Sequence, residues 1–115
     1  MRHRRKTKKL GRSADHRKAL LRNLATSLSL HGHVKTTTSK AKALVAYYEH
    51  LITLTKGKEE MNAIRNIKRY LYTEDAQKAF MKRLPELNKS SGHLQAVKLG
   101  TRPGDRADVS LVQFV

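Results

Sequence analysis

The chain contains no cysteine and no tryptophan, and it has few prolines, aromatic side chains and acidic residues. The absence of cysteine excludes disulfides, thiol catalysis and thiolate metal sites, and it suits a protein of the reducing cytoplasm. No apolar run approaches the roughly 18 residues that a membrane-spanning helix needs. The opening segment also lacks the apolar stretch of a secretory signal. With 115 residues, the chain has the length of one domain with a modest core.

Positive charge is the dominant feature that the sequence does have. Lys and Arg number 25 against 9 Asp and Glu, which gives a formal net charge of +16. Residues 1–12 carry seven of these cations, no acid and one aliphatic side chain, Leu10. Such a segment has nothing to bury, and its self-repulsion is relieved against phosphate. We therefore predict an extended basic tail at 1–12, which binds a polyanion, and a globular domain at 13–115.

Helical spacing of apolar residues predicts two helices in the first half of the domain. Ser13 is a good N-cap for the first helix, and Gly32 is placed to end it. Its inward stripe is predicted at Leu20, Leu21, Leu24, Leu28 and His31. The second helix, capped by Thr38 or Ser39 and ending at Gly57, has the strongest periodic pattern and should be the central core helix.

Two further helices are predicted in the second half. The third opens with Glu59 and Glu60, and its inward residues are expected to be Met61, Ile64, Ile67 and Leu71. The fourth is capped by Thr73, and its inward residues are expected to be Ala76, Phe80 and Leu84.

Three short segments rich in β-branched or aliphatic residues predict strands, at 33–37, 94–99 and 108–115. The last two should be antiparallel neighbours, and residues 102–105 between them fit a type II turn. The order helix, strand, three helices and two strands predicts an α+β two-layer single domain, with helices on one face of a three-stranded sheet. Where the first strand joins the sheet is left open.

The start of the second helix has an unusual composition. Lys40 and Lys42 are predicted in its first turn, where positive charge opposes the helix dipole, and hydroxyl residues 36–39 surround them. Free backbone N–H groups, hydroxyls and ammonium groups together attract phosphate, so this segment predicts a second anion site. The alternative is an ordinary helix cap on the surface.

Catalytic and metal chemistry is not indicated by the sequence. The closest histidine pair, His31 and His33, has no third ligand nearby, and the phosphate-binding G-x-x-x-x-G-K motif is missing. Five of the nine carboxylates lie at predicted helix starts, four of them as adjacent pairs, which is capping chemistry. We therefore predict that the chain is not an enzyme, uses no metal or other cofactor, and has neither a small-molecule substrate nor a membrane partner.

Six blocks of the sequence carry a specific resemblance to a known family. They are MRHR at 1–4, KLGR at 9–12, HRKALLRNLATSL at 16–28, HGHVKTTTSKAKAL at 31–44, EHLITLTKG at 49–57 and KLGTRPGD at 98–105. Together they resemble the family of the seventeenth protein of the bacterial large ribosomal subunit. Residues 58–92 match it only in helical pattern, and positions 45–46 and 92–97 depart from it.

The resemblance implies an rRNA-binding structural protein of the large subunit in cytoplasmic ribosomes, near the nascent-chain exit and beside other large-subunit proteins. Phosphate and shape contacts would dominate such binding. The resemblance implies RNA contacts at Arg2, His3, Arg4, Lys9, Arg12, His16, Arg17, Arg22, Asn23, Lys35, Thr36, Thr37, Lys40, Lys42 and Arg102. The charge pattern adds Arg5, Lys6, Lys8, Lys18 and Arg106 to this predicted RNA-binding set.

A basic DNA-binding protein, architectural or regulatory, is the alternative function. It would place a helix in the major groove and read base edges with exposed polar side chains. Only Asn62, Arg65 and Asn66 in the third helix have that character.

Overall fold

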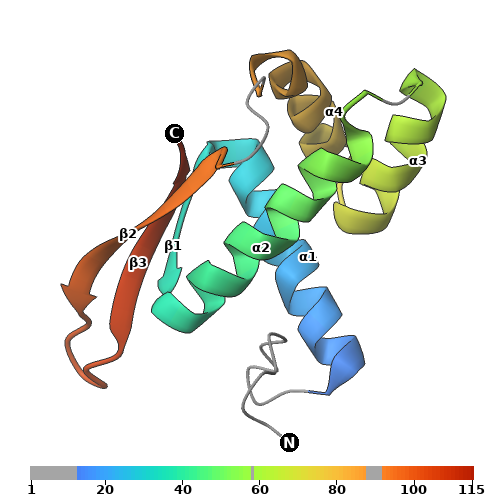
Figure 1. Ribbon diagram of the computed structural model, residues 1–115. Coiled ribbons are helices and arrows are strands. Elements are labelled where there is room, and N and C mark those ends of the chain that lie inside the picture. Colours follow the sequence, from blue (N-terminus) through green and yellow to red (C-terminus); the bar gives the residue numbers. More distant parts are fainter. Residues whose placement is uncertain (1–12, 58, 88–91) are drawn as a thin grey trace, which may run out of the picture.

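The computed structural model describes residues 13–57, 59–87 and 92–115. Its elements follow the predicted order (Figure 1): α1 (Ala14–His31), β1 (His33–Thr37), α2 (Thr38–Thr55), α3 (Glu60–Tyr70), α4 (Glu74–Arg83), the 3₁₀ turn η1 (Leu84–Glu86), β2 (Leu94–Thr101) and β3 (Asp108–Phe114). The predicted basic tail at 1–12 lies outside the described residues.

The ends of α1 form as the sequence predicts. The Ser13 hydroxyl accepts a hydrogen bond from the backbone N–H of His16 at 3.4 Å, which caps the amino terminus. Gly32 has a φ of 80°, and its N–H donates to the carbonyl of Leu28. This left-handed geometry suits glycine, so the chain can leave the helix and enter β1 directly.

The start of α2 differs from the prediction that Thr38 or Ser39 caps it. The helix begins at Thr38, so the N-cap is Thr37, and the Thr37 side chain makes no capping hydrogen bond. The Thr38 hydroxyl instead pairs with the hydroxyl of Ser110 on β3 at 2.9 Å. The Thr38 hydroxyl, which the sequence predicted as a helix cap, therefore binds the sheet instead.

The sheet has the order β1-β3-β2, and both pairings are antiparallel. The pairing of β2 with β3 confirms the predicted antiparallel pair, and β1 joins the free side of β3. Val34 and Val112 are buried on the face that α1 and α2 cover, while His33 and Lys35 are exposed on the other face. The prediction of two layers, with helices on one face of the sheet, is confirmed (Figure 1).

The β2–β3 turn is longer by one residue than the predicted type II turn. Gly104 has the expected positive φ, 101°, but the closing hydrogen bond runs from the N–H of Arg106 to the carbonyl of Arg102 at 3.0 Å. Arg106 itself has a φ of 55°. The six residues 102–107 connect β2 to β3, so the two antiparallel strands form a hairpin with a loop longer than a tight two-residue turn.

The core centres on α2, as its periodicity predicts. Leu44, Tyr48, Leu51 and Ile52 are almost fully buried, and residues from every other helix and from the sheet pack around them. The Tyr48 ring lies 5.6 Å from the ring of Phe80 on α4, and its hydroxyl is hydrogen-bonded to Ser29 of α1 at 2.7 Å. This contact joins α1, α2 and α4.

Three residues that were predicted to point inward do not. Met61 is 66% exposed, Ile64 is 36% exposed, and His31 is exposed. The buried residues of α3 are Ala63 and Ile67, which lie four apart, so this helix buries a narrower stripe than its apolar residues suggest. In α1, the buried set is Ala25, Thr26, Leu28 and Ser29.

Candidate nucleic-acid interface

The described part of the predicted RNA-binding set comes from three places in the fold. These are the first half of α1, the segment from β1 into α2, and the β2–β3 turn, and all three reach the lower side of the molecule in Figure 1. The tail residues of the set, Arg2 to Arg12, lie outside the described residues. Of the remaining members, His16, Lys18, Asn23, Lys35, Lys42, Arg102 and Arg106 are exposed, and Arg17, Arg22, Thr36, Thr37 and Lys40 are half-buried.

The sheet brings β1 and the β2–β3 turn together. Lys35 and Thr36 line a shallow cleft of about 270 Å³ with Thr101 and Arg102, although these pairs are far apart in sequence. They meet because β1 and β2 both pair with β3, so that Thr37 and Gly100 each lie opposite Val109. The chain continues from Thr37 straight into α2. The predicted second anion site therefore adjoins a cation from the carboxy-terminal hairpin.

Arg102 is engaged within the turn. Its guanidinium Nε donates to Asp105 at 3.1 Å, and its Nη2 donates to the other carboxylate oxygen. This pairing, helped by the backbone N–H of Ala107, lowers the pKa of Asp105 to about 2. Arg106 is exposed and forms no ion pair with another described residue. At neutral pH the turn thus presents the Arg102 guanidinium paired with Asp105 and the exposed Arg106 guanidinium without an ion pair among the described residues.

Arg22 of α1 contacts the end of α3 and the connection that follows it. Its Nη2 donates to the carbonyl of Lys68 at 2.6 Å and lies 3.4 Å from that of Leu71, at the end of α3. The guanidinium also lies 4.2 Å from the centre of the Tyr72 ring. Its Nε is buried without a partner among the described residues. Arg22 therefore ties α1 to the α3–α4 connection, a structural role that its helical spacing did not reveal.

A second cleft opens beside Arg22 and contains residues that sequence reasoning missed. It has a volume of about 410 Å³ and is lined by Asp15, Lys18, Ala19, Arg22, Tyr47, Arg69, Tyr70 and Tyr72. Three of the four tyrosines in the chain thus gather in one place. The cluster of Arg65, Lys68 and Arg69 on α3 was the one available sequence signal. Tyr70 and Tyr72 lie two positions apart, but Tyr47 comes from α2, so no local pattern links all three.

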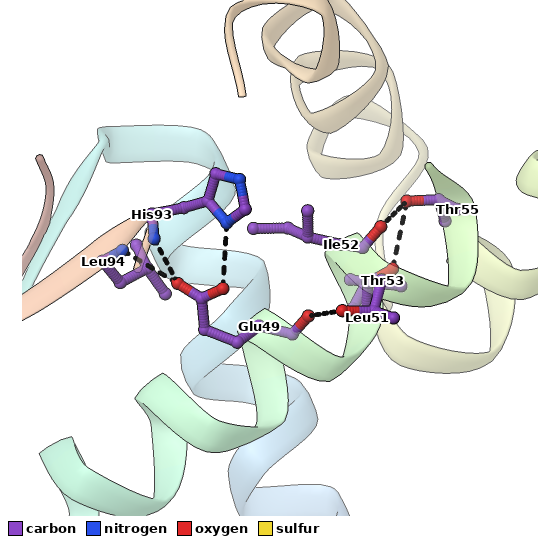
Figure 2. A network of polar contacts seen from close by, with 7 residues as sticks. All are labelled: Glu49, Leu51, Ile52, Thr53, Thr55, His93 and Leu94. Atoms are coloured by element: carbon purple, nitrogen blue, oxygen red, sulfur yellow. Dashed lines mark hydrogen bonds and ion pairs between the residues drawn. The ribbon is translucent and has the colours of Figure 1, made fainter. Parts of the chain in front are cut away.

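Glu49 and His93 form a polar contact that also lies outside the predicted set. Figure 2 shows the Glu49 carboxylate on α2 accepting hydrogen bonds from the backbone N–H groups of His93 and Leu94, at 2.6 and 3.0 Å. The His93 ring Nδ1 lies 2.9 Å from the second carboxylate oxygen. The carboxylate therefore fixes the start of β2 against α2. This network is structural, because His93 is almost fully buried.

Two of the three side chains that a DNA-reading helix would use make contacts within the fold. The Asn66 amide donates to the carbonyl of Leu54 at 3.2 Å and is half-buried. The neighbouring Arg65 guanidinium lies 3.8 Å from the sulfur of Met61 on its own helix. This arrangement does not favour the alternative of major-groove reading by α3.

Residues 13–57, 59–87 and 92–115 contain no group of three or more His, Asp or Glu side chains arranged to hold a metal ion. Within the same ranges, no helix has the length and apolar character needed to cross a bilayer.

Comparison with known proteins gives a consistent family assignment. Residues 20–115 match the family described as Ribosomal protein L17. The large ribosomal subunit protein bL17 of Endomicrobium trichonymphae is 46% identical over 109 residues, which cover 93% of this chain and 92% of that protein. The bL17 protein of Nautilia profundicola is 40% identical over 125 residues, covering 100% and 98%. That of Desulfitobacterium hafniense is 40% identical over 110 residues, covering 94% and 97%.

Proposed function

Since the chain belongs to the ribosomal protein L17 family, we propose that it binds large-subunit rRNA through phosphate and shape contacts near the nascent-chain exit side. As a member of this family it is a structural constituent of the large ribosomal subunit and not an enzyme. It associates there with rRNA and with other ribosomal proteins. The proposal adds which surface meets the RNA and by what chemistry.

The observation that carries the proposal is the excess of exposed cations without acidic partners. The formal net charge is +16. Among the described residues, Lys18, Lys35, Lys42, Arg69 and Arg106 are exposed and form no ion pair. Isolated cations of this kind repel one another in the free protein, and phosphate relieves that repulsion. A bound polyanion should therefore relieve the repulsion that these cations cause in the free protein.

The start of α2 supplies the most specific phosphate contact in the proposal. It has no acidic residue in its first turn and no side-chain cap, whereas α1 and α4 have both. Lys40 follows in the first turn and Lys42 in the next. Uncapped N–H groups at a helix start attract anions, and two ammonium groups strengthen that attraction. Lys35 and the β2–β3 turn extend the same positive surface.

The proposal is tested by titrating the full chain with large-subunit rRNA at increasing salt concentration. Each neutralised phosphate adds roughly 0.7 to 0.9 to the slope of log affinity against log salt, so a steep negative slope is expected. Duplex DNA of equal length serves as the competitor and should displace the rRNA poorly, because shape contacts depend on the folded RNA. A slope near zero, or equal binding to duplex DNA, would overturn the proposal.

A further inference from the structure

The cleft beside Arg22 combines aromatic rings with cations. Its lining comes from the start of α1, the middle of α2, the end of α3 and the following connection. Lys18, Arg22 and Arg69 are the three cations in the lining, and Asp15 is the single acid. The volume of about 410 Å³ falls within the roughly 300–1,000 Å³ typical of small-ligand pockets.

The rings in this cleft are held in place. Tyr47 donates its hydroxyl hydrogen bond to the carbonyl of Tyr70 at 3.2 Å, and the two rings lie 5.1 Å apart at an angle of 59°. Tyr72 packs under the Arg22 guanidinium, which is itself anchored to the end of α3. Tyr72 nevertheless remains 43% exposed, so part of a fixed aromatic surface is open to solvent. A planar group can stack there with little loss of side-chain freedom.

The cations narrow the choice of occupant. Lys18 and Arg69 are exposed and form no ion pair with a described residue, while Arg22 brings a third positive charge into the wall. A basic protein segment, including the cationic residues 1–12 of this chain, would meet like charge here. A nucleotide matches both the aromatic and the cationic part of the cleft, because its base stacks on aromatic rings and its phosphates pair with ammonium and guanidinium groups.

We propose that this cleft binds one unpaired base of the rRNA, stacked on Tyr72, with Lys18 and Arg69 contacting the flanking phosphates. The inference rests on the proposed rRNA-binding function and adds a nucleotide site to it. A purine suits the site best, since a larger ring covers more of the exposed tyrosine surface. Asp15 accepts hydrogen bonds from the exocyclic amino group of a base and repels phosphate, so it orients the base inward.

The test compares two probes with the same number of phosphates, a short oligoadenylate and an abasic oligomer of equal length. The full chain should bind oligoadenylate more tightly. Replacement Tyr72→Leu should weaken oligoadenylate binding roughly fivefold or more and leave abasic binding unchanged, because one stacked base is lost. The matched control Tyr72→Phe keeps the ring and should bind both probes as the wild type does.

Charge variants separate stacking from phosphate contact. Lys18→Gln and Arg69→Gln should weaken binding of both probes and reduce the salt slope by roughly 0.7 each, as expected for single-stranded nucleic acid. Lys82→Gln, which removes an exposed cation of α4 outside the cleft, should have a smaller effect on both probes. Thermal melts of each variant verify that the domain is folded.

Photocrosslinking of the unmodified chain provides a measurement that does not depend on a variant. Oligomers that carry 5-iodouridine should crosslink to peptides containing Tyr70 or Tyr72. Equal affinity for the two probes with a retained salt slope, or crosslinks only at other peptides, would overturn the base site and leave the proposed function intact. Loss of the salt slope with both probes would instead count against the proposed function itself.

Discussion

At the scale of single residues, Arg22 shows how one side chain can belong to the fold as well as to a binding surface. Charge and family resemblance both assigned it to RNA, yet its guanidinium is hydrogen-bonded to backbone carbonyls at the end of α3. Those carbonyls lack partners within the helix, so the cation both satisfies them and complements the negative end of the dipole. Helical spacing places Arg22 on a face of α1 but cannot tell which element packs there.

Replacement Arg22→Lys tests this structural role. The lysine keeps the charge but loses the planar stacking on Tyr72 and the fixed geometry of the guanidinium. The free energy of unfolding should fall by about 1–2 kcal/mol, as expected for loss of a charged hydrogen bond. Urea denaturation measures the change. The control Lys18→Arg, on the same helix and exposed, should lie within about 0.5 kcal/mol of the wild type. Equal stability of Arg22→Lys would show that the clamp is not needed.

The buried hydroxyl of Tyr48 gives a pH-dependent prediction. Burial raises the pKa of Tyr48 to about 12, and the hydrogen bond with Ser29 offsets part of that rise. The unfolded chain has an ordinary tyrosine pKa of about 10, so the folded state holds the proton more tightly. Stability should therefore fall as the pH rises from about 10 towards 12. Burial likewise raises the pKa of Tyr47, which adds to the same loss.

Replacement Tyr48→Phe tests both the hydrogen bond of Tyr48 with Ser29 and the titration of the Tyr48 hydroxyl. At neutral pH the variant should be about 1 kcal/mol less stable, because Ser29 loses its buried partner. Above pH 10 the variant should lose less stability than the wild type, since it lacks the Tyr48 hydroxyl whose pKa is raised by folding. Thermal melts between neutral and alkaline pH measure both effects. Parallel alkaline curves would contradict the assignment.

At the scale of elements, α2 serves both the core and the proposed RNA surface. Its middle residues are buried, while its start lacks a side-chain cap and an acid and carries Lys40 and Lys42 instead. The positive end of the dipole makes these lysines slightly unfavourable in the free protein. If these lysines lower the stability of the free protein and raise its affinity for rRNA, their role is in binding rather than in folding.

The double replacement Lys40→Gln and Lys42→Gln tests this trade. The free protein should become more stable by a few tenths of a kcal/mol, mainly through Lys40 in the first turn. The salt slope for rRNA binding should fall by about 1.5, as expected for two lost phosphate contacts. The control Lys82→Gln, in the last turn of α4, should change stability in the opposite direction. Wild-type rRNA binding by the double variant would show that the start of α2 is an ordinary helix start and not a phosphate site.

The elements themselves could largely be predicted from the sequence, because their signals are local. Ser13 and Thr73 cap the starts of α1 and α4, and Gly32 ends α1, each through a hydrogen bond to a residue within four positions. The pairing of β1 with β3 and the exposure of Met61 depend on packing between distant segments, which periodicity does not encode. The same limit applies to the site. The cations of β1, α2 and the turn were predicted from family resemblance and local charge pattern, whereas the tyrosine cleft was missed because three elements build it.

At the scale of the whole molecule, the described residues contain a buried core of their own. The buried cluster runs from Ala25 to Val112, and α1 is capped by Ser13. The division into a tail at 1–12 and a domain at 13–115 stays a prediction.

Deletion of residues 1–12 tests this division. The truncated chain should keep its cooperative thermal transition, because no member of the buried cluster is removed. Its salt slope for rRNA binding should fall by several units, since seven cations are lost and each phosphate contact contributes roughly 0.7 to 0.9. Loss of the thermal transition would show that the tail belongs to the domain.

The central claim is that the start of α1, the start of α2 and the β2–β3 turn form the RNA-facing side of the molecule. Cryo-electron microscopy of large subunits that contain this chain tests it most directly. The expected result is rRNA phosphates within hydrogen-bond distance of Lys35, Lys40, Lys42 and Arg106, with α4 and η1 turned away from the RNA. A map in which α4 and η1 meet the rRNA, while the start of α2 and the hairpin turn face solvent, would contradict the claim.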